Sequence, residues 1–113
     1  YSFTINYITK HPTDKLNDLI RLLQENHADD FTSSGLLNTI GNLLLRFNEN
    51  LDWAIELFKT NVQQYPEDGN LWDSLGDGYK ANNLKGDAIK SYQKAIELGY
   101  TDSQKKLTEL IKT

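Results

Sequence analysis

Apolar residues recur every three to four positions through most of this 113-residue chain, with polar residues between them. Such spacing places the apolar side chains on one face of an α-helix and therefore predicts amphipathic helices. The pattern predicts helices over about residues 13–26, 35–47, 51–65, 71–81, 84–98 and 102–112.

The first residues follow a different pattern, in which Tyr1, Phe3, Ile5 and Tyr7 alternate with polar residues. Alternation with a period of two is typical of an extended strand. One interpretation is an extended tail or linker over residues 1–12 that packs loosely on the helices. The other is the final strand of an upstream domain.

Residues that favour helix ends separate the predicted helices. Ser33 and Ser34 are expected to cap one helix, because a serine hydroxyl can accept a hydrogen bond from an unpaired amide of the first turn. Asn70 and Thr101 are expected to do the same for later helices. Gly99 is expected just after a helix, where the backbone commonly turns left-handed.

Two stretches of the chain repeat one pattern 35 positions apart: Leu37, Ile40, Gly41 and Leu44 match Trp72, Leu75, Gly76 and Tyr79. In the following helices, the matching residues Ala54 and Phe58 lie 34 positions before Ala88 and Tyr92. The first copy therefore has one extra residue, which we place in the turn at residues 48–50. The two glycines are expected where helices come close together, and Trp72 is expected to be buried between helices.

The second copy carries the order W-x2-L-G-x2-Y followed by A-x3-aromatic. This order resembles the tetratricopeptide repeat (TPR), a helix–turn–helix unit of about 34 residues. The resemblance implies an all-α fold of TPR-like antiparallel helix pairs that form an α-α superhelix. It predicts a helical domain over residues 13–113, with about two full repeats at 34–68 and 69–102.

A leading half repeat and a capping helix would flank these repeats. The half repeat, with its apolar stripe at Leu16, Leu19, Ile20 and Leu23, would be a second helix whose first helix is missing. The capping helix at 102–112 is expected to end the array with a polar outer face made by Lys105, Lys106, Glu109 and Lys112.

The chain from Leu37 to Ile111 also resembles the TPR tail that follows the catalytic domain of many bacterial exported serine hydrolases, of the putative-esterase and β-lactamase-like kinds. The residues that carry this resemblance are Leu37-Asn38, Ile40-Gly41, the run 54–59, Asn61-Val62, Tyr65-Pro66 and the run 70–76. It implies a serine hydrolase as parent chain and a periplasmic or extracellular location. The resemblance also implies that the parent is a bacterial protein. The lack of methionine, even at position 1, favours a piece of a longer chain or a processed product.

Composition narrows the classes of function. The 16 acidic and 12 basic residues give a formal net charge of -4, which disfavours binding to nucleic acid or to an anionic membrane surface. The longest aliphatic run, at residues 43–45, is too short for membrane insertion. The absence of cysteine excludes disulfides, a thiol nucleophile and thiolate metal ligands.

Ser74 is the residue to compare with a hydrolase nucleophile. A nucleophile elbow needs glycine two residues before the serine, and Trp72 stands there instead. His11 and His27 are the only histidines, and neither has a partner at the spacing that a catalytic triad demands. The fragment is therefore predicted to be no enzyme, with no catalytic residues and no cofactor.

Two clusters of polar residues superficially resemble metal sites. His27, Asp29 and Asp30 lie close in sequence, but a structural zinc site wants four ligands. Asp68-Gly69-Asn70 resembles part of a calcium loop without its ligand ladder and closing glutamate. Both are predicted to be solvated loop residues, and no metal site is expected.

In a TPR, the first helix of each pair lines a concave groove that binds a partner. Counting from the matched motif, the groove positions are Asn38, Asn42 and Arg46 in the first repeat and Asp73, Asp77 and Lys80 in the second. Some TPR modules capture a peptide carboxylate at these positions, but Asp73 and Asp77 would repel one. The alternative is that these two are a capping charge and a solvated helix face.

The sequence thus predicts a non-catalytic protein–protein interaction module, whose partner is a protein or peptide in trans or a part of the same parent chain. A weak homodimer is a further expectation, because two repeats are few for a stable array. The alternative function is an intrachain structural domain that docks on an upstream serine hydrolase domain. Such docking requires a contiguous apolar patch, for which Tyr1, Phe3, Ile5 and Tyr7 are candidates, whereas a groove would be polar and open.

Overall fold

The computed structural model describes residues 2–26 and 34–112. All regular elements in these two ranges are helices, so the all-α prediction is confirmed. In chain order they are α1 (Ser2–Lys10), the 3₁₀ helix η1 (Thr13–Lys15), α2 (Leu16–Asn26), α3 (Gly35–Phe47), α4 (Leu51–Gln64), α5 (Gly69–Ala81), α6 (Lys85–Glu97) and α7 (Ser103–Lys112).

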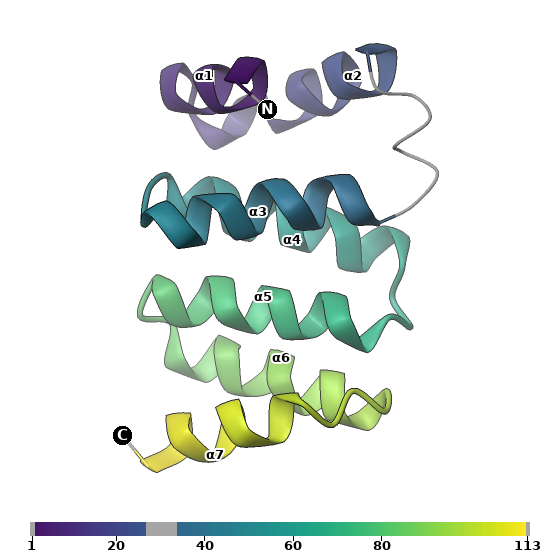
Figure 1. Ribbon diagram of the computed structural model, residues 1–113, viewed down its shortest axis with the longest axis vertical. Helices are drawn as coiled ribbons and strands as arrows, with labels where there is room; N and C mark the ends of the chain where they lie inside the picture. Colours follow the sequence, from purple (N-terminus) through teal and green to yellow (C-terminus); the bar gives the residue numbers. More distant parts are fainter. Residues whose placement is uncertain (1, 27–33, 113) are drawn as a thin grey trace.

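The helices are stacked in rows along the longest axis of the molecule, which extends 41 Å (Figure 1). α1 and α2 lie at one end, α3 and α4 form the next row, α5 and α6 the third, and α7 lies at the other end. α3 packs on α4 and α5 packs on α6, while α4 and α5 join the two rows. Short turns at residues 48–50 and 82–84 connect the helices within each row, so those neighbours run in opposite directions.

A continuous apolar core runs through the stack. Leu19 and Leu23 of α2 contribute to it together with Ile8 of α1 and buried residues of α3, α4 and α5. The predicted apolar stripe of α2 is therefore confirmed, with Leu16 and Ile20 half-buried at its edge. A smaller cluster joins α6 to α7 through Ala88, Tyr92, Leu107 and Leu110.

The predicted close approach at Gly41 and Gly76 is confirmed. A Cβ atom added at Gly76 would lie 2.5 Å from Cε1 of Tyr92, and one added at Gly41 would collide with the ring of Phe58. The ring of Phe58 also approaches α5, where a Cβ at Gly78 would lie 3.1 Å from its Cδ2. Phe58 of α4 is thus enclosed by glycine backbones from both neighbouring helices.

The helices α3, α5 and α6 end in the same backbone motif. Each is followed by a left-handed residue, namely Asn48 (φ 53°), Asn83 (φ 63°) or Gly99 (φ 94°). The amide of the next residue then donates to a carbonyl five residues earlier, in the pairs Glu49–Leu44, Leu84–Tyr79 and Tyr100–Ala95. This is a Schellman motif, and it confirms the helix end expected at Gly99.

The extra residue of the first turn can be located from this motif. From Asn83 the chain passes one residue, Leu84, before α6 begins, whereas from Asn48 it passes both Glu49 and Asn50 before α4. Asn50 is itself left-handed, with φ 50°. The extra residue therefore lies in the predicted 48–50 turn.

The extended conformation predicted for residues 1–12 is wrong, because Ser2–Lys10 form α1. Thr4 and Ile8, four residues apart, are its buried positions, and Phe3 is 56% exposed. The interpretation of this segment as a strand, based on a period of two, did not consider Ile8. The burial of Ile8 against the core fixes the helical register. α2 is therefore preceded by a helix, whereas the sequence predicted that this helix is missing. Tyr1 lies outside the described residues.

Two predicted helix caps are corrected. Ser34 precedes α3 with helical dihedrals, so its hydroxyl makes no cap hydrogen bond, and Ser33 lies outside the described residues. Asp68 rather than Asn70 caps α5, since its carboxylate accepts a hydrogen bond of 3.1 Å from the amide of Asn70. At α7, the amide of Gln104 bonds to the backbone carbonyl of Thr101 at 3.0 Å.

Trp72, predicted to be buried between helices, is only partly buried against the core, and Trp53 is the fully buried tryptophan, 1% exposed. Trp72 lies in the first turn of α5 and is half-buried, with its Nε1 donating to the carbonyl of Pro66 at 2.8 Å. Nε1 of Trp53 donates to the carbonyl of His11 at 2.8 Å, and its ring meets Tyr7 edge-on with centroids 6.5 Å apart. Trp53 therefore links α4 to the N-terminal helices.

Candidate interaction surface

The six residues predicted to line a groove lie on α3 and α5, but only four of them line the same hollow. Asn42 and Arg46 of α3 and Asp77 and Lys80 of α5 line one open hollow, together with Leu45 and Ala81. Asn38 and Asp73 are not among its lining residues. The hollow exists because α3 and α5 are neighbours in space, although 34 residues separate their first residues in the chain.

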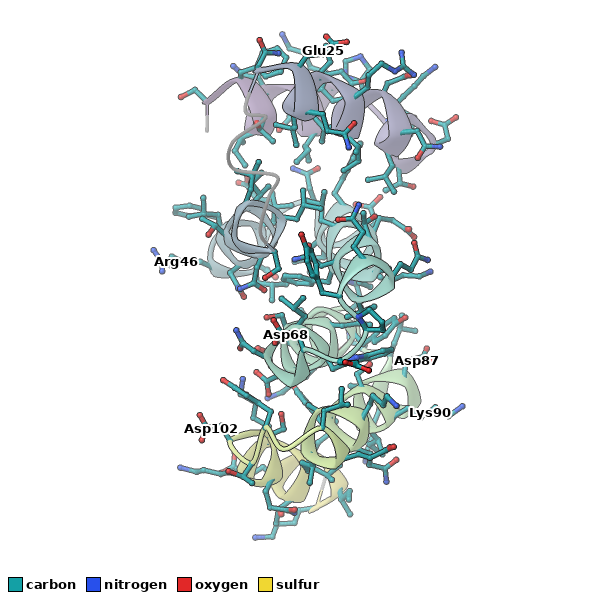
Figure 2. The ribbon with its side chains drawn as sticks, turned by 90° about the vertical axis from the view of Figure 1, so that its right-hand side faces the viewer. Glu25, Arg46, Asp68, Asp87, Lys90 and Asp102 are labelled. Atoms are coloured by element: carbon teal, nitrogen blue, oxygen red, sulfur yellow. The ribbon has the colours of Figure 1, made fainter. Side chains whose placement is uncertain are left out.

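The α3 side of the hollow is polar and exposed. Asn42 and Arg46 are four residues apart, so they lie on one face of the helix. Both side chains are exposed, and Figure 2 shows Arg46 pointing away from the helices. Lys80 on α5 is exposed too, and within residues 2–26 and 34–112 neither cation forms a salt bridge. These two charges are available to a ligand.

Asn38 lies two turns before Arg46 on α3 and is half-buried. Its Oδ1 atom is fully buried and has no hydrogen-bond partner among the described residues. Asn38 does not line the hollow and therefore lies outside the candidate surface.

Asp73 is held by the last helix. It is 4% exposed, and its two carboxylate oxygens accept hydrogen bonds from Oγ of Ser103 (2.6 Å) and Nζ of Lys106 (2.8 Å). The same Nζ donates to Oδ2 of Asp77 at 3.0 Å, and Oδ1 of Asp77 accepts from the hydroxyl of Tyr92 at 2.6 Å. One ammonium and two hydroxyls thus satisfy two carboxylates, as burial of charge requires.

This network changes the charge expected on the surface. The sequence predicts repulsion of a carboxylate by Asp73 and Asp77, but Lys106 lies against both of them and offsets one of their two negative charges. Asp73 is neither a groove residue nor a solvated capping charge, because it is buried beneath α7. Asp77 keeps one edge in the hollow and is 28% exposed.

Lys106 is not on the polar outer face predicted for the capping helix. Ser103, Lys106, Leu107 and Leu110 follow the spacing i, i+3, i+4, i+7, which places them together on the inward face of α7. Lys105, Glu109 and Lys112 are exposed, as predicted. The helical spacing around Leu107 and Leu110 was the signal that could have revealed the inward position of Lys106.

The network shifts the proton affinity of two of its members. Burial by itself lowers the pKa of Lys106, but its hydrogen bonds to Asp73 and Asp77 and their negative charges outweigh burial and raise the pKa. Burial, followed by the hydrogen bond to Asp77, raises the pKa of the Tyr92 hydroxyl. Both groups therefore hold their protons more tightly in the folded chain than in the unfolded one.

Stability is consequently expected to fall in alkaline solution. A raised pKa gives a stabilising contribution that is complete below the unfolded pKa and is lost as the pH rises above about 10. Urea unfolding, measured from about pH 8 to about pH 11, should show this fall, and Tyr92→Phe should show a smaller one. An equal alkaline fall in the parent and in Tyr92→Phe would contradict the role given to Tyr92.

Removal of the Lys106 charge is expected to destabilise the attachment of α7. Lys106→Met should lower the free energy of unfolding by about 1 to 2 kcal/mol, because the buried carboxylate of Asp73 loses its counter-ion, while partial exposure of Lys106 moderates the effect. Lys105→Met, one position away and exposed, is the control and should change it by less than about 0.5 kcal/mol. Equal stability of the two variants would show that the ion pair contributes nothing.

The other residues considered for chemistry have structural surroundings. Ser74 is buried in α5, and His11 stacks on the ring of Tyr7 at 4.0 Å while its Nδ1 lies 2.8 Å from the carbonyl oxygen of Tyr7. His27, Asp29 and Asp30 lie outside the described residues. In the part of the chain that is described, no three acidic, histidine or cysteine residues gather as a metal site would require.

Two side-chain amide contacts were not expected from the sequence. Nδ2 of Asn61, whose side chain is buried, donates to the carbonyl of Ser34 at 3.0 Å and so ties α4 to the start of α3. Nδ2 of Asn82 donates to the carbonyl of Leu51 at 3.1 Å and so ties the end of α5 to the start of α4. No local pattern signals either contact, because the partners are 27 and 31 residues apart.

Comparisons with known proteins found no relative of this chain. No protein-family model, no curated protein and no solved structure matches this chain. Across residues 2–26 and 34–112, no helix combines the length and apolar character that crossing a membrane requires. Function is therefore inferred from the surface itself.

Proposed function

We propose that the chain is a non-catalytic, TPR-like interaction module that binds a protein or peptide along the face formed by α3 and α5. The observation that carries this proposal is the open hollow lined by Asn42, Arg46, Asp77 and Lys80. These residues lie on α3 and α5, which are the first helices of two successive helix pairs. Exposed cations without partners in the described chain, set in a concave surface, suit recognition of a polar partner.

Two features support the TPR-like interpretation. The contact of Gly41 with Phe58 has the same form as the contact of Gly76 with Tyr92. α3 and α5 also end in the same left-handed motif. Successive pairs with equivalent contacts are expected of a helical repeat array, whose first helices share one face.

The distribution of exposed apolar side chains favours this proposal over docking on a domain of the same chain. Of the N-terminal residues predicted to form a docking patch, Phe3 is the only large apolar residue exposed in the described ranges. On α1, Ile5 and Tyr7 pack against the core instead of joining Phe3 in an apolar patch. Docking within the chain would require such a patch.

Selection of peptides from a random library displayed on phage tests the proposal. Peptides that bind the immobilised chain should lose at least about tenfold in affinity when Asn42→Trp fills the hollow. Lys90→Trp is the matched control, since Lys90 is exposed in α6 and lies on the opposite side of the molecule from Arg46 (Figure 2). Failure to select any peptide, or equal loss in both variants, would contradict the proposal.

A further inference from the structure

A second hollow adjoins the first at Lys80. It is lined by Lys80, Asn83, Lys85 and Leu110, so it extends the surface from α5 to the start of α6. The two hollows share Lys80 and together form a path from α3 across α5 to α6. We call this surface the Arg46–Lys85 path.

The Arg46–Lys85 path is cationic on a protein that is acidic as a whole. Arg46, Lys80 and Lys85 line it, and none of the three forms a salt bridge within the described ranges. Among the described residues, Asp77 is the one acidic residue that lines it, and both of its oxygens already accept hydrogen bonds, from Tyr92 and Lys106. The formal net charge of the chain is -4, so the charge of this surface is opposite in sign to the net charge of the chain.

Apolar side chains accompany the cations. Leu45 and Leu110 line the two hollows. Leu45 is half-buried and Leu110 is 8% exposed, so each contributes part of its side chain to this surface. Apolar side chains beside exposed cations are complementary to a segment that carries both carboxylates and apolar side chains.

We propose that the Arg46–Lys85 path binds an extended acidic peptide segment with apolar side chains among its carboxylates. This inference rests on the proposed function and names its partner class. The segment's carboxylates pair with Arg46, Lys80 and Lys85, and its apolar side chains contact the leucines that line the path. Phosphate backbones carry the same charge, but repulsion from the rest of this acidic chain opposes the approach of a long polyanion.

Fluorescence anisotropy with two labelled peptides tests the inference. One probe alternates Glu with Ala and Leu, and the other has Gln at every Glu position. The Glu peptide is expected to bind about tenfold or more tightly than the Gln peptide, with an affinity that falls as salt is added. The triple variant Arg46→Gln/Lys80→Gln/Lys85→Gln should lose about tenfold for the Glu peptide, because each exposed ion pair is worth roughly 1.5- to 5-fold.

A second triple variant controls for net charge. Lys10→Gln/Lys90→Gln/Lys105→Gln removes the same number of charges from exposed lysines elsewhere and should change the affinity by less than about twofold. Equal loss in both triple variants, or equal binding of the Gln peptide, would overturn the inference. Stronger competition by a single-stranded oligonucleotide than by the Glu peptide would also overturn it, in favour of nucleic acid.

The outcomes separate this inference from the proposed function. If library peptides require the hollow but contain no excess of Asp and Glu, the interaction module stands and the acidic partner is wrong. If no peptide requires the hollow, the proposed function itself fails.

Discussion

Trp53→Ala is expected to lower the free energy of unfolding by about 3 to 5 kcal/mol, which is a large part of the stability of a domain this small. Trp53 is 1% exposed and lies among buried residues of α4, so its removal leaves a cavity that the packed helices cannot close. The substitution also removes the hydrogen bond from Nε1 to the carbonyl of His11 and the contact with Tyr7. α1 and η1 therefore lose an anchor at the same time.

Urea unfolding followed by far-ultraviolet circular dichroism measures this effect. Trp72→Ala is the matched control, because Trp72 is half-buried and its Nε1 bonds to Pro66 near the surface. The control should cost less than about 2 kcal/mol. A larger loss in Trp72→Ala than in Trp53→Ala would contradict the packing described above.

Gly76→Leu is expected to have the second largest effect, a loss of about 3 kcal/mol or more. The first side-chain carbon alone would lie 2.5 Å from the ring of Tyr92. That ring has no room to move, because it is fully buried and its hydroxyl is bonded to Asp77. The branched side chain of leucine must therefore push α5 and α6 apart.

Gly86→Ala is the control for the intrinsic helix propensity of the substitution. Gly86 lies in α6, and no atom would come within 4 Å of an added Cβ. There, alanine should leave the stability unchanged or raise it by up to about 1 kcal/mol, whereas Gly76→Ala should lower it. Thermal unfolding that shows Gly76→Ala and Gly76→Leu both stabilised would mean that α5 and α6 do not pack in this register.

The sequence predicts the middle of the fold well because its signals there are local. Helical spacing locates α3 to α7, and glycine spacing predicts where aromatic rings meet backbones, at Gly41 and Gly76. The extra turn residue follows from counting alone. The N-terminal segment failed because Phe3, Ile5 and Tyr7 mimic a strand, while the deciding contact of Ile8 with the core is a tertiary one.

The candidate surface, too, could be predicted only where the signals are local. Exposure of Asn42, Arg46 and Lys80 follows from their helix positions, and the structure places all three in one hollow. The burial of Asp73 could not be predicted locally, because Lys106 lies 33 residues away in the chain. Long-range ion pairs of this kind change both the charge and the exposure of a surface, and they become visible when the helices are placed together.

Nuclear magnetic resonance titration of the isotopically labelled chain with a library-selected peptide tests the central claim most directly. The largest amide shifts are expected on the α3–α5 face, at Asn42, Arg46 and Lys80. Residues of α6 on the far side, such as Lys90, should keep their positions. Largest shifts around Lys90, with the amides of the hollow unchanged, would contradict the assignment of this face as the binding surface.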